Sequence, residues 1–177
     1  MQHDNAAISA VIRAGIGSSV SHCILYIGNG EVVEAVGEGV TRRSLASALE
    51  HASLAIALRR RSLTPLQQRA VIDHATGFAR RNLPYDAIGA AGSGVAQGSK
   101  GAVLAGYGCQ LYLPLCTVAG GAVANNARSA NADSAFFCSE LVARCFELAG
   151  APVVQGAASF VGPRAIRWAN TLETLES

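Results

Sequence analysis

Two short apolar segments near the start of the chain flank a glycine-rich turn. Residues 22–27 and 31–36 are rich in β-branched and other apolar side chains, and Gly28, Asn29 and Gly30 lie between them. Glycine and asparagine tolerate the positive φ angles that tight hairpin turns require. The pattern predicts a β-hairpin with residues 22–27 and 31–36 as its strands.

Helical signals follow the hairpin. Residues 41–52 predict a short helix with Thr41 as its N-cap. Thr64 and Pro65 combine an N-cap with a proline at the first helical position, which is a stronger start signal. The apolar stripe that follows them predicts a helix that ends near Arg81.

The final third of the chain contains another amphipathic helix. Asp133 or Ser134 can cap its start, and Gly150 fits the position just after its end. Two weaker signals lie elsewhere: residues 53–60 fit a strand or a helix equally well, and residues 164–172 predict a last helical stretch. The apolar side chains of the amphipathic helix repeat at helical spacing and are Cys138, Leu141, Val142, Cys145, Phe146 and Ala149.

Residues 87–132 differ from the rest of the chain in composition. They hold nine glycines, one lysine and one arginine, and no acidic residue. We interpret them as an insertion in a single domain that spans residues 1–177. Residues 101–127 carry no charge, which suits a membrane span, but their five glycines and Pro114 favour a lid or wall beside a site.

The overall composition narrows the classes of function. The 177 residues carry 14 basic and 12 acidic side chains, and half of them are apolar. Most arginines fall in pairs and one triplet rather than in a stripe interleaved with aromatic residues, so nucleic-acid binding is not expected.

The cysteines and the first residues of the chain indicate the compartment. Five cysteines, an odd number, form no C-x-x-C pair and lie at no zinc-finger spacing from a histidine, which disfavours a disulfide framework and a structural zinc site. No signal peptide is recognisable at the start of the chain. We therefore expect reduced thiols in the cytoplasm, although export by a dedicated secretion machine would leave the same pattern.

Cys138 is the first candidate for chemistry. It falls in the first turn of the predicted amphipathic helix, where unpaired backbone N–H groups and the helix dipole stabilise an anion. Its thiol should therefore ionise readily. A cysteine on an apolar stripe is more often an inert core residue, and that is our interpretation of Cys145, one heptad later.

His22 is the candidate partner of Cys138. Alternation along the first strand places His22 and Tyr26 on one face and Cys23 on the other, so Cys23 is expected to be a core thiol. A histidine at the end of a strand is, taken alone, more often half-exposed and structural. A third residue beside His22 would strengthen the catalytic interpretation.

The register of the hairpin decides whether Glu34 is that third residue. If residues 28–30 form a three-residue loop, Ile24 pairs with Glu34, and the carboxylate shares the face of His22. A two-residue Asn-Gly turn would pair Leu25 with Glu34 and turn the carboxylate away. In the first register, Glu34 can orient the imidazole and stabilise its charged form.

These segments together resemble a known family. SHCILYIGNGEVVEA and FFCSELVARCFELAG resemble the histidine hairpin and the nucleophile helix of circularly permuted NlpC/P60 papain-like proteins, especially the YiiX/YaeF-type amidases. In that family the histidine precedes the cysteine along the chain, as it does here. LPYD at residues 83–86 is similar to the family's Tyr-Asp element, and SFVGPRAI at residues 159–166 to its C-terminal Ser-x-x-x-Pro segment.

The resemblance implies a fold, an activity and the roles of six residues. The implied fold is α+β and papain-like, with a small antiparallel sheet packed against the nucleophile helix. The implied triad has Cys138 as the nucleophile, His22 as general base and then general acid, and Glu34 as the orienting residue. For Tyr85 and Asp86 a structural role is favoured over a direct one, because such a pair after a helix commonly packs and caps a turn. The candidate substrate-binding residues are Tyr26, Tyr85 and Asp86.

The implied activity is that of a cysteine amidase or peptidase acting on a peptide or isopeptide-like amide, from the cell wall or from a modified protein. Such chemistry needs no metal and no organic cofactor. Two alternatives keep the same scaffold. One is a lipid acyl hydrolase or acyltransferase of the lecithin:retinol acyltransferase type, with residues 101–127 as its membrane contact. The other is a non-catalytic binding module or effector that an immunity protein recognises.

Overall fold

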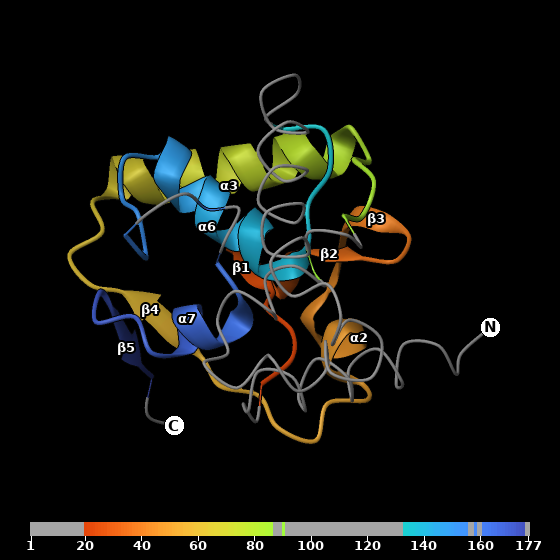
Figure 1. Ribbon diagram of the computed structural model, residues 1–177, viewed down its shortest axis with the longest axis horizontal. Coiled ribbons are helices and arrows are strands. Elements are labelled where there is room, and N and C mark those ends of the chain that lie inside the picture. The colour runs from red at the N-terminus through yellow and green to blue at the C-terminus, as the bar shows by residue number, and fades with distance from the viewer. Residues whose placement is uncertain (1–19, 87–89, 91–132, 156–157, 159–160, 176–177) are drawn as a thin grey trace, which may run out of the picture.

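The computed structural model describes residues 20–86, 90, 133–155, 158 and 161–175 (Figure 1). It combines small antiparallel sheets with helices, which confirms the α+β class. The proposed insertion at residues 87–132 lies outside the described residues except for residue 90, so its interpretations stay predictions. The elements are β1 (Leu25–Gly28), β2 (Glu31–Val36), β3 (Gly39–Ser44), α2 (Leu45–Leu49), β4 (Leu58–Arg60), α3 (Pro65–Arg80), α6 (Cys138–Leu148), α7 (Pro163–Arg167) and β5 (Leu172–Thr174).

The first hairpin forms with a turn that differs from the predicted one. Asn29 and Gly30 are the two turn residues, with φ angles of 54° and 73°, as a type I′ turn requires. A β-bulge between Tyr26 and Gly28 adds one residue to β1. The predicted three-residue loop is therefore wrong.

The bulge nevertheless produces the register that the catalytic interpretation needs. Leu25 pairs with Val33, and continuing this pairing places Ile24 opposite Glu34. The extra residue in β1 compensates for the shorter turn, so the carboxylate of Glu34 stays on the face of His22.

The predicted helix over residues 41–52 is wrong in its first half. Thr41 is not an N-cap but lies in β3, where it pairs with Glu34. Gly37 and Glu38 turn the chain back after β2, Gly39 starts β3 with a φ of 108°, and β3 then satisfies the backbone groups at the free edge of β2. The helix starts later as α2, whose cap is Ser44, with a hydroxyl that accepts a 3.1 Å hydrogen bond from the backbone of Ser47.

The helix after Thr64 is confirmed as α3. The Thr64 hydroxyl accepts from the Gln67 backbone N–H at 3.2 Å, and the Gln67 side chain accepts from the Thr64 N–H at 3.1 Å. This reciprocal capping box fixes the start that Thr64 and Pro65 predict. One face of α3 buries Val71, Ala75 and Phe78.

The predicted end of α6 is confirmed, but its predicted start is wrong. Neither Asp133 nor Ser134 caps the helix, because residues 136–137 are extended and α6 begins at Cys138. A parallel bridge between Tyr85 and Phe136 holds this extended segment. At the other end Gly150 has a φ of 67°, and a 2.9 Å hydrogen bond from Ala151 to the Phe146 carbonyl closes the helix.

The C-terminal segment forms a short helix followed by a strand. The predicted helical stretch over residues 164–172 is right only as far as Arg167, where α7 ends. Strand β5 then pairs with β4, which decides in favour of a strand for the ambiguous segment around residues 58–60.

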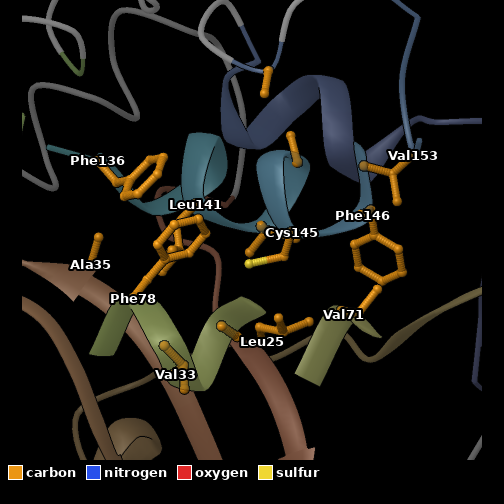
Figure 2. Packing of buried hydrophobic residues seen from close by; sticks show 14 of the residues in the cluster. Leu25, Val33, Ala35, Val71, Phe78, Phe136, Leu141, Cys145, Phe146 and Val153 are labelled. Carbon is orange, nitrogen blue, oxygen red and sulfur yellow. The ribbon is translucent and has the colours of Figure 1, made fainter. Parts of the chain in front are cut away.

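The core lies between the two long helices and one face of the meander β1-β2-β3 (Figure 2). Val33 of β2, Phe78 of α3 and Leu141 of α6 belong to this cluster. The rings of Phe78 and Phe136 lie 4.8 Å apart, so the segment just before α6 is anchored on α3. This packing fixes the start of α6 against the sheet. No helix among the described segments has the length and apolar character needed to cross a bilayer.

Candidate active site

Cys138 is the first residue of α6 and is 5% exposed. The first backbone N–H groups of a helix have no acceptor within it, so they favour a negative charge at this position. The sulfur of Cys138 accepts hydrogen bonds from the backbone N–H groups of Cys23 and Ser139 and from the side chain of His22. The predicted placement of Cys138 in the first helical turn is therefore confirmed.

His22 lies between Cys138 and Glu34. Its Nε2 atom is 2.5 Å from Oε2 of Glu34, and its side chain also hydrogen-bonds with Cys138. Because Nε2 contacts the carboxylate, Nδ1 is the ring nitrogen left for the sulfur. The side chain is 37% exposed, which leaves part of the ring open to solvent.

Glu34 is almost completely buried on β2, with its side chain 4% exposed. Its second carboxylate oxygen, Oε1, lies 2.6 Å from Nε of Arg43 on β3. Arg43 is a site residue that the sequence interpretation missed, because residues 41–44 were expected to start a helix. The Gly-Glu-Gly sequence at residues 37–39, which forms the turn and the start of β3, is the local signal that could have placed Arg43 on a strand beside Glu34.

Hydrogen bonding and charge shift the pKa values of the Cys138–His22 pair in opposite directions. Burial alone raises the pKa of Cys138, but the hydrogen bond and positive charge of His22 and the two backbone donors bring it below its usual value. Burial alone lowers the pKa of His22, but hydrogen bonds and negative charge from Cys138 and Glu34 raise it to about 10. The arrangement favours a thiolate beside an imidazolium.

The other described cysteines are in surroundings that suppress ionisation. Cys23 packs against the core, as predicted, and burial and the charge of Cys138 raise its pKa well above the usual value. Cys145 is fully buried between α6 and α3, and burial raises its pKa to about 12 (Figure 2). All three described cysteines, Cys23, Cys138 and Cys145, are free thiols.

The remaining predicted site residues, Tyr26, Tyr85 and Asp86, make different kinds of contact. Tyr26 is 55% exposed, and its hydroxyl accepts a 3.1 Å hydrogen bond from the Gly30 backbone, so it braces the hairpin turn. Burial, followed by the charges of Cys138 and Asp86, raises the pKa of Tyr85 to about 12. The backbone of Asp86 donates to the Phe136 carbonyl at 3.0 Å. These contacts show a supporting role for the Tyr-Asp segment; substrate binding by the three residues stays a prediction.

Comparisons with known proteins do not identify a family for this chain. No protein-family model matches the chain, and neither a curated protein nor a solved structure is significantly similar to it. Within the described part of the chain, no group of three or more His, Cys, Asp or Glu side chains is arranged to hold a metal ion. The resemblance to permuted papain-like amidases therefore rests on the motifs quoted above.

Proposed function

We propose that this protein is a cysteine hydrolase that cleaves an amide bond through Cys138, His22 and Glu34. The observation that carries the proposal is the position of the His22 ring, which hydrogen-bonds with the sulfur of Cys138 and with the carboxylate of Glu34. A His-Glu pair with only a structural role would not require a neighbouring thiol whose pKa is lowered, as that of Cys138 is. This combination is typical of activated cysteine nucleophiles.

The first half-reaction forms a thioester. The thiolate of Cys138 attacks the amide carbonyl carbon, and the carbonyl π electrons move to the oxygen, which becomes an oxyanion. When the tetrahedral intermediate collapses, the C–N bond breaks and the His22 imidazolium gives its proton to the departing nitrogen. An amine leaves, and the acyl group stays on the sulfur.

The second half-reaction restores the enzyme. His22, now neutral, takes a proton from water as the water oxygen attacks the thioester carbon. The C–S bond breaks, the thiolate of Cys138 leaves, and the acid product departs as a carboxylate after losing its proton. Glu34 keeps the imidazole oriented and stabilises its charged form in both halves.

Two groups are candidates to stabilise the developing oxyanion. The backbone N–H of Cys138 has no acceptor within α6, because it belongs to the first residue of the helix. The Tyr85 hydroxyl, with a pKa of about 12, stays protonated at neutral pH and can donate a hydrogen bond. We propose Tyr85 as the substrate-binding residue on the carbonyl side of the site.

A substrate panel tests the proposal. The purified protein is offered acyl-aminomethylcoumarin amides, including cell-wall-type peptides, together with phospholipid vesicles, and wild type is compared with Cys138→Ala and Cys145→Ala. We expect amide cleavage by wild type and Cys145→Ala and none by Cys138→Ala, with an acyl adduct visible by intact mass spectrometry. Equal turnover by wild type and Cys138→Ala would refute the proposal, and cleavage of phospholipid alone would favour the lipid hydrolase.

A further inference from the structure

We propose that Arg43 is a positioning residue of this site, which holds the carboxylate of Glu34 in the orientation that reaches His22. The inference deepens the proposed function and rests on it for its catalytic meaning.

The register of β2 and β3 places Arg43 diagonally opposite Glu34. Glu34 pairs with Thr41, and Arg43 lies two residues further along β3, on the same face of the sheet. Diagonal neighbours of this kind lie within reach of long side chains. The Nε atom of Arg43 accordingly lies 2.6 Å from Oε1 of Glu34.

The two oxygens of Glu34 are divided between two cationic partners. Oε2 faces Nε2 of His22 at 2.5 Å, and Oε1 faces Nε of Arg43. The last torsion of a glutamate side chain is broad, so one contact alone leaves the carboxylate plane poorly defined. The ion pair with Arg43 engages the second oxygen, which has no hydrogen-bond partner among the described residues, so charge attraction rather than an aligned hydrogen bond favours this orientation of the plane.

Burial makes the second contact necessary. The Glu34 side chain is 4% exposed, so water has little access to a carboxylate oxygen that loses its partner. An unpaired buried charge is costly, and the carboxylate would turn or admit water to recover a partner. Either response weakens the hydrogen bond that Glu34 accepts from His22, which helps raise the pKa of His22.

The neighbouring residue on β3 provides a matched control. Arg42 forms an ion pair with Glu31, also across a diagonal of β2 and β3, but on the opposite face and at an exposed position. Arg42→Gln therefore removes a guanidinium from the same strand without touching Glu34. Effects specific to Arg43 appear as differences between the variants at the two positions.

The experiment compares Arg43→Gln, Arg43→Lys and Arg42→Gln with wild type. The pKa of His22 is measured by NMR titration of 13C-labelled histidine, and the His22 signal is assigned by its loss in His22→Gln. The rate at which iodoacetamide alkylates Cys138 is measured across the same pH range. Neither readout needs a substrate, so both remain valid if the proposed hydrolase activity is not found.

We expect Arg43→Gln to lower the pKa of His22 by roughly one unit, and to move the pH midpoint of Cys138 alkylation upward, because a less firmly held imidazolium stabilises the thiolate less well. Arg43→Lys should recover part of the His22 pKa shift and part of the Cys138 reactivity, and Arg42→Gln should match wild type in both measurements. If an amide substrate is in hand, kcat should fall by about tenfold or more with KM little changed, because the lost contact acts on His22 in the transition state rather than on substrate binding.

Two results would overturn the inference. One is a folded Arg43→Gln protein with the His22 pKa and the Cys138 reactivity of Arg42→Gln. The other is a loss of Cys138 reactivity in Arg43→Gln and Arg43→Lys without any shift in the His22 pKa, which would show that Arg43 does not act through the contact between Glu34 and His22. Failure of the proposed function would give a different result. In that case Cys138 of the wild-type protein would react with iodoacetamide no faster than an ordinary thiol.

Discussion

Cys138 and Cys145 lie on the same face of α6, two helical turns apart, in opposite chemical surroundings. Three hydrogen-bond donors converge on the sulfur of Cys138, whose pKa is below the usual value. Cys145 is fully buried among apolar side chains, and burial raises its pKa to about 12. Because the thiolate is the reactive form, the two residues should differ sharply in reactivity.

We expect iodoacetamide at pH 7 to alkylate Cys138 at least tenfold faster than Cys145 in the folded protein. A thiol with a pKa near 9 is about 1% ionised at pH 7, and one near 12 is less ionised by a further factor of about a thousand. Trypsin cleaves after Arg128 and Arg144, so the two cysteines fall in separate peptides and their labelling is read by mass spectrometry. Denatured protein, in which both thiols react at similar rates, is the control. Equal labelling of the two peptides in the folded state would contradict the assignment of Cys138.

Removing His22 should abolish the low pKa of Cys138. The hydrogen bond and the positive charge of His22 offset the burial that otherwise raises the pKa of this thiol. In His22→Gln, burial is no longer offset by His22, and the pH at which alkylation reaches half its maximal rate should move upward. The rate at pH 7 should fall by about tenfold or more. His74→Gln, on α3 and outside the site, serves as the control, and a pH profile of His22→Gln that overlays wild type would refute the pairing.

The raised pKa of His22 predicts a loss of stability at alkaline pH. Its pKa in the folded protein, about 10, lies above its ordinary value of 6.5, so its contribution is complete below pH 6.5 and disappears as pH rises through about 10. Above pH 9 the thiol of Cys138 is ionised in the unfolded chain as well as in the folded protein, so it no longer contributes to the pH dependence. His22 is then the member of the pair that still binds a proton on folding. Urea denaturation of wild type and of the double variant His22→Gln, Cys138→Ala, in which neither member of the pair titrates, should therefore show a difference in unfolding free energy that shrinks between pH 9 and 10.5. A difference in unfolding free energy that grows over this interval would show that the His22 pKa is not raised in the folded protein.

Local sequence signals were sufficient where the structure depends on neighbouring residues. Thr64 and Pro65 specify the start of α3, and Gly150 specifies the end of α6, because each acts on backbone groups within one turn. The start of α6 could not be read in this way. Phe137 is not a typical N-cap. The segment before the helix is kept extended by a bridge between Phe136 and Tyr85, which lies about fifty residues earlier in the sequence.

The triad illustrates the same limit. Alternation correctly placed His22 and Glu34 on one face, although the turn that produces this register combines two residues with a bulge. Arg43 was missed because residues 41–44 carry two polar and two charged side chains and show no apolar alternation, so strand β3 is specified by pairing with β2 rather than by its own pattern. Contacts between strands, unlike helix caps, depend on which segments the fold brings together.

Gly39 is one position where this long-range packing can be tested by a single methyl group. It has a φ of 108°, and a Cβ atom added there would lie 2.6 Å from the backbone oxygen of Leu83. That oxygen also accepts a 2.8 Å hydrogen bond from Val40, which ties the β2–β3 turn to the segment that leads to Tyr85. Gly39→Ala must therefore adopt an unfavourable φ and also displace the Leu83 backbone.

We expect Gly39→Ala to reduce the free energy of unfolding by roughly 1–3 kcal/mol, the cost typical of backbone strain at one residue. Gly37→Ala is the matched control, because its φ is not in the left-handed range and an added Cβ would meet no atom within 4 Å, so its effect should stay within about 0.5 kcal/mol. Urea denaturation of both variants measures the difference. The displaced Leu83 segment should also slow alkylation of Cys138 in Gly39→Ala, because Tyr85 and Phe136 connect that segment to the start of α6. Equal stability of the two variants would mean that the contact between the β2–β3 turn and Leu83 does not constrain the fold.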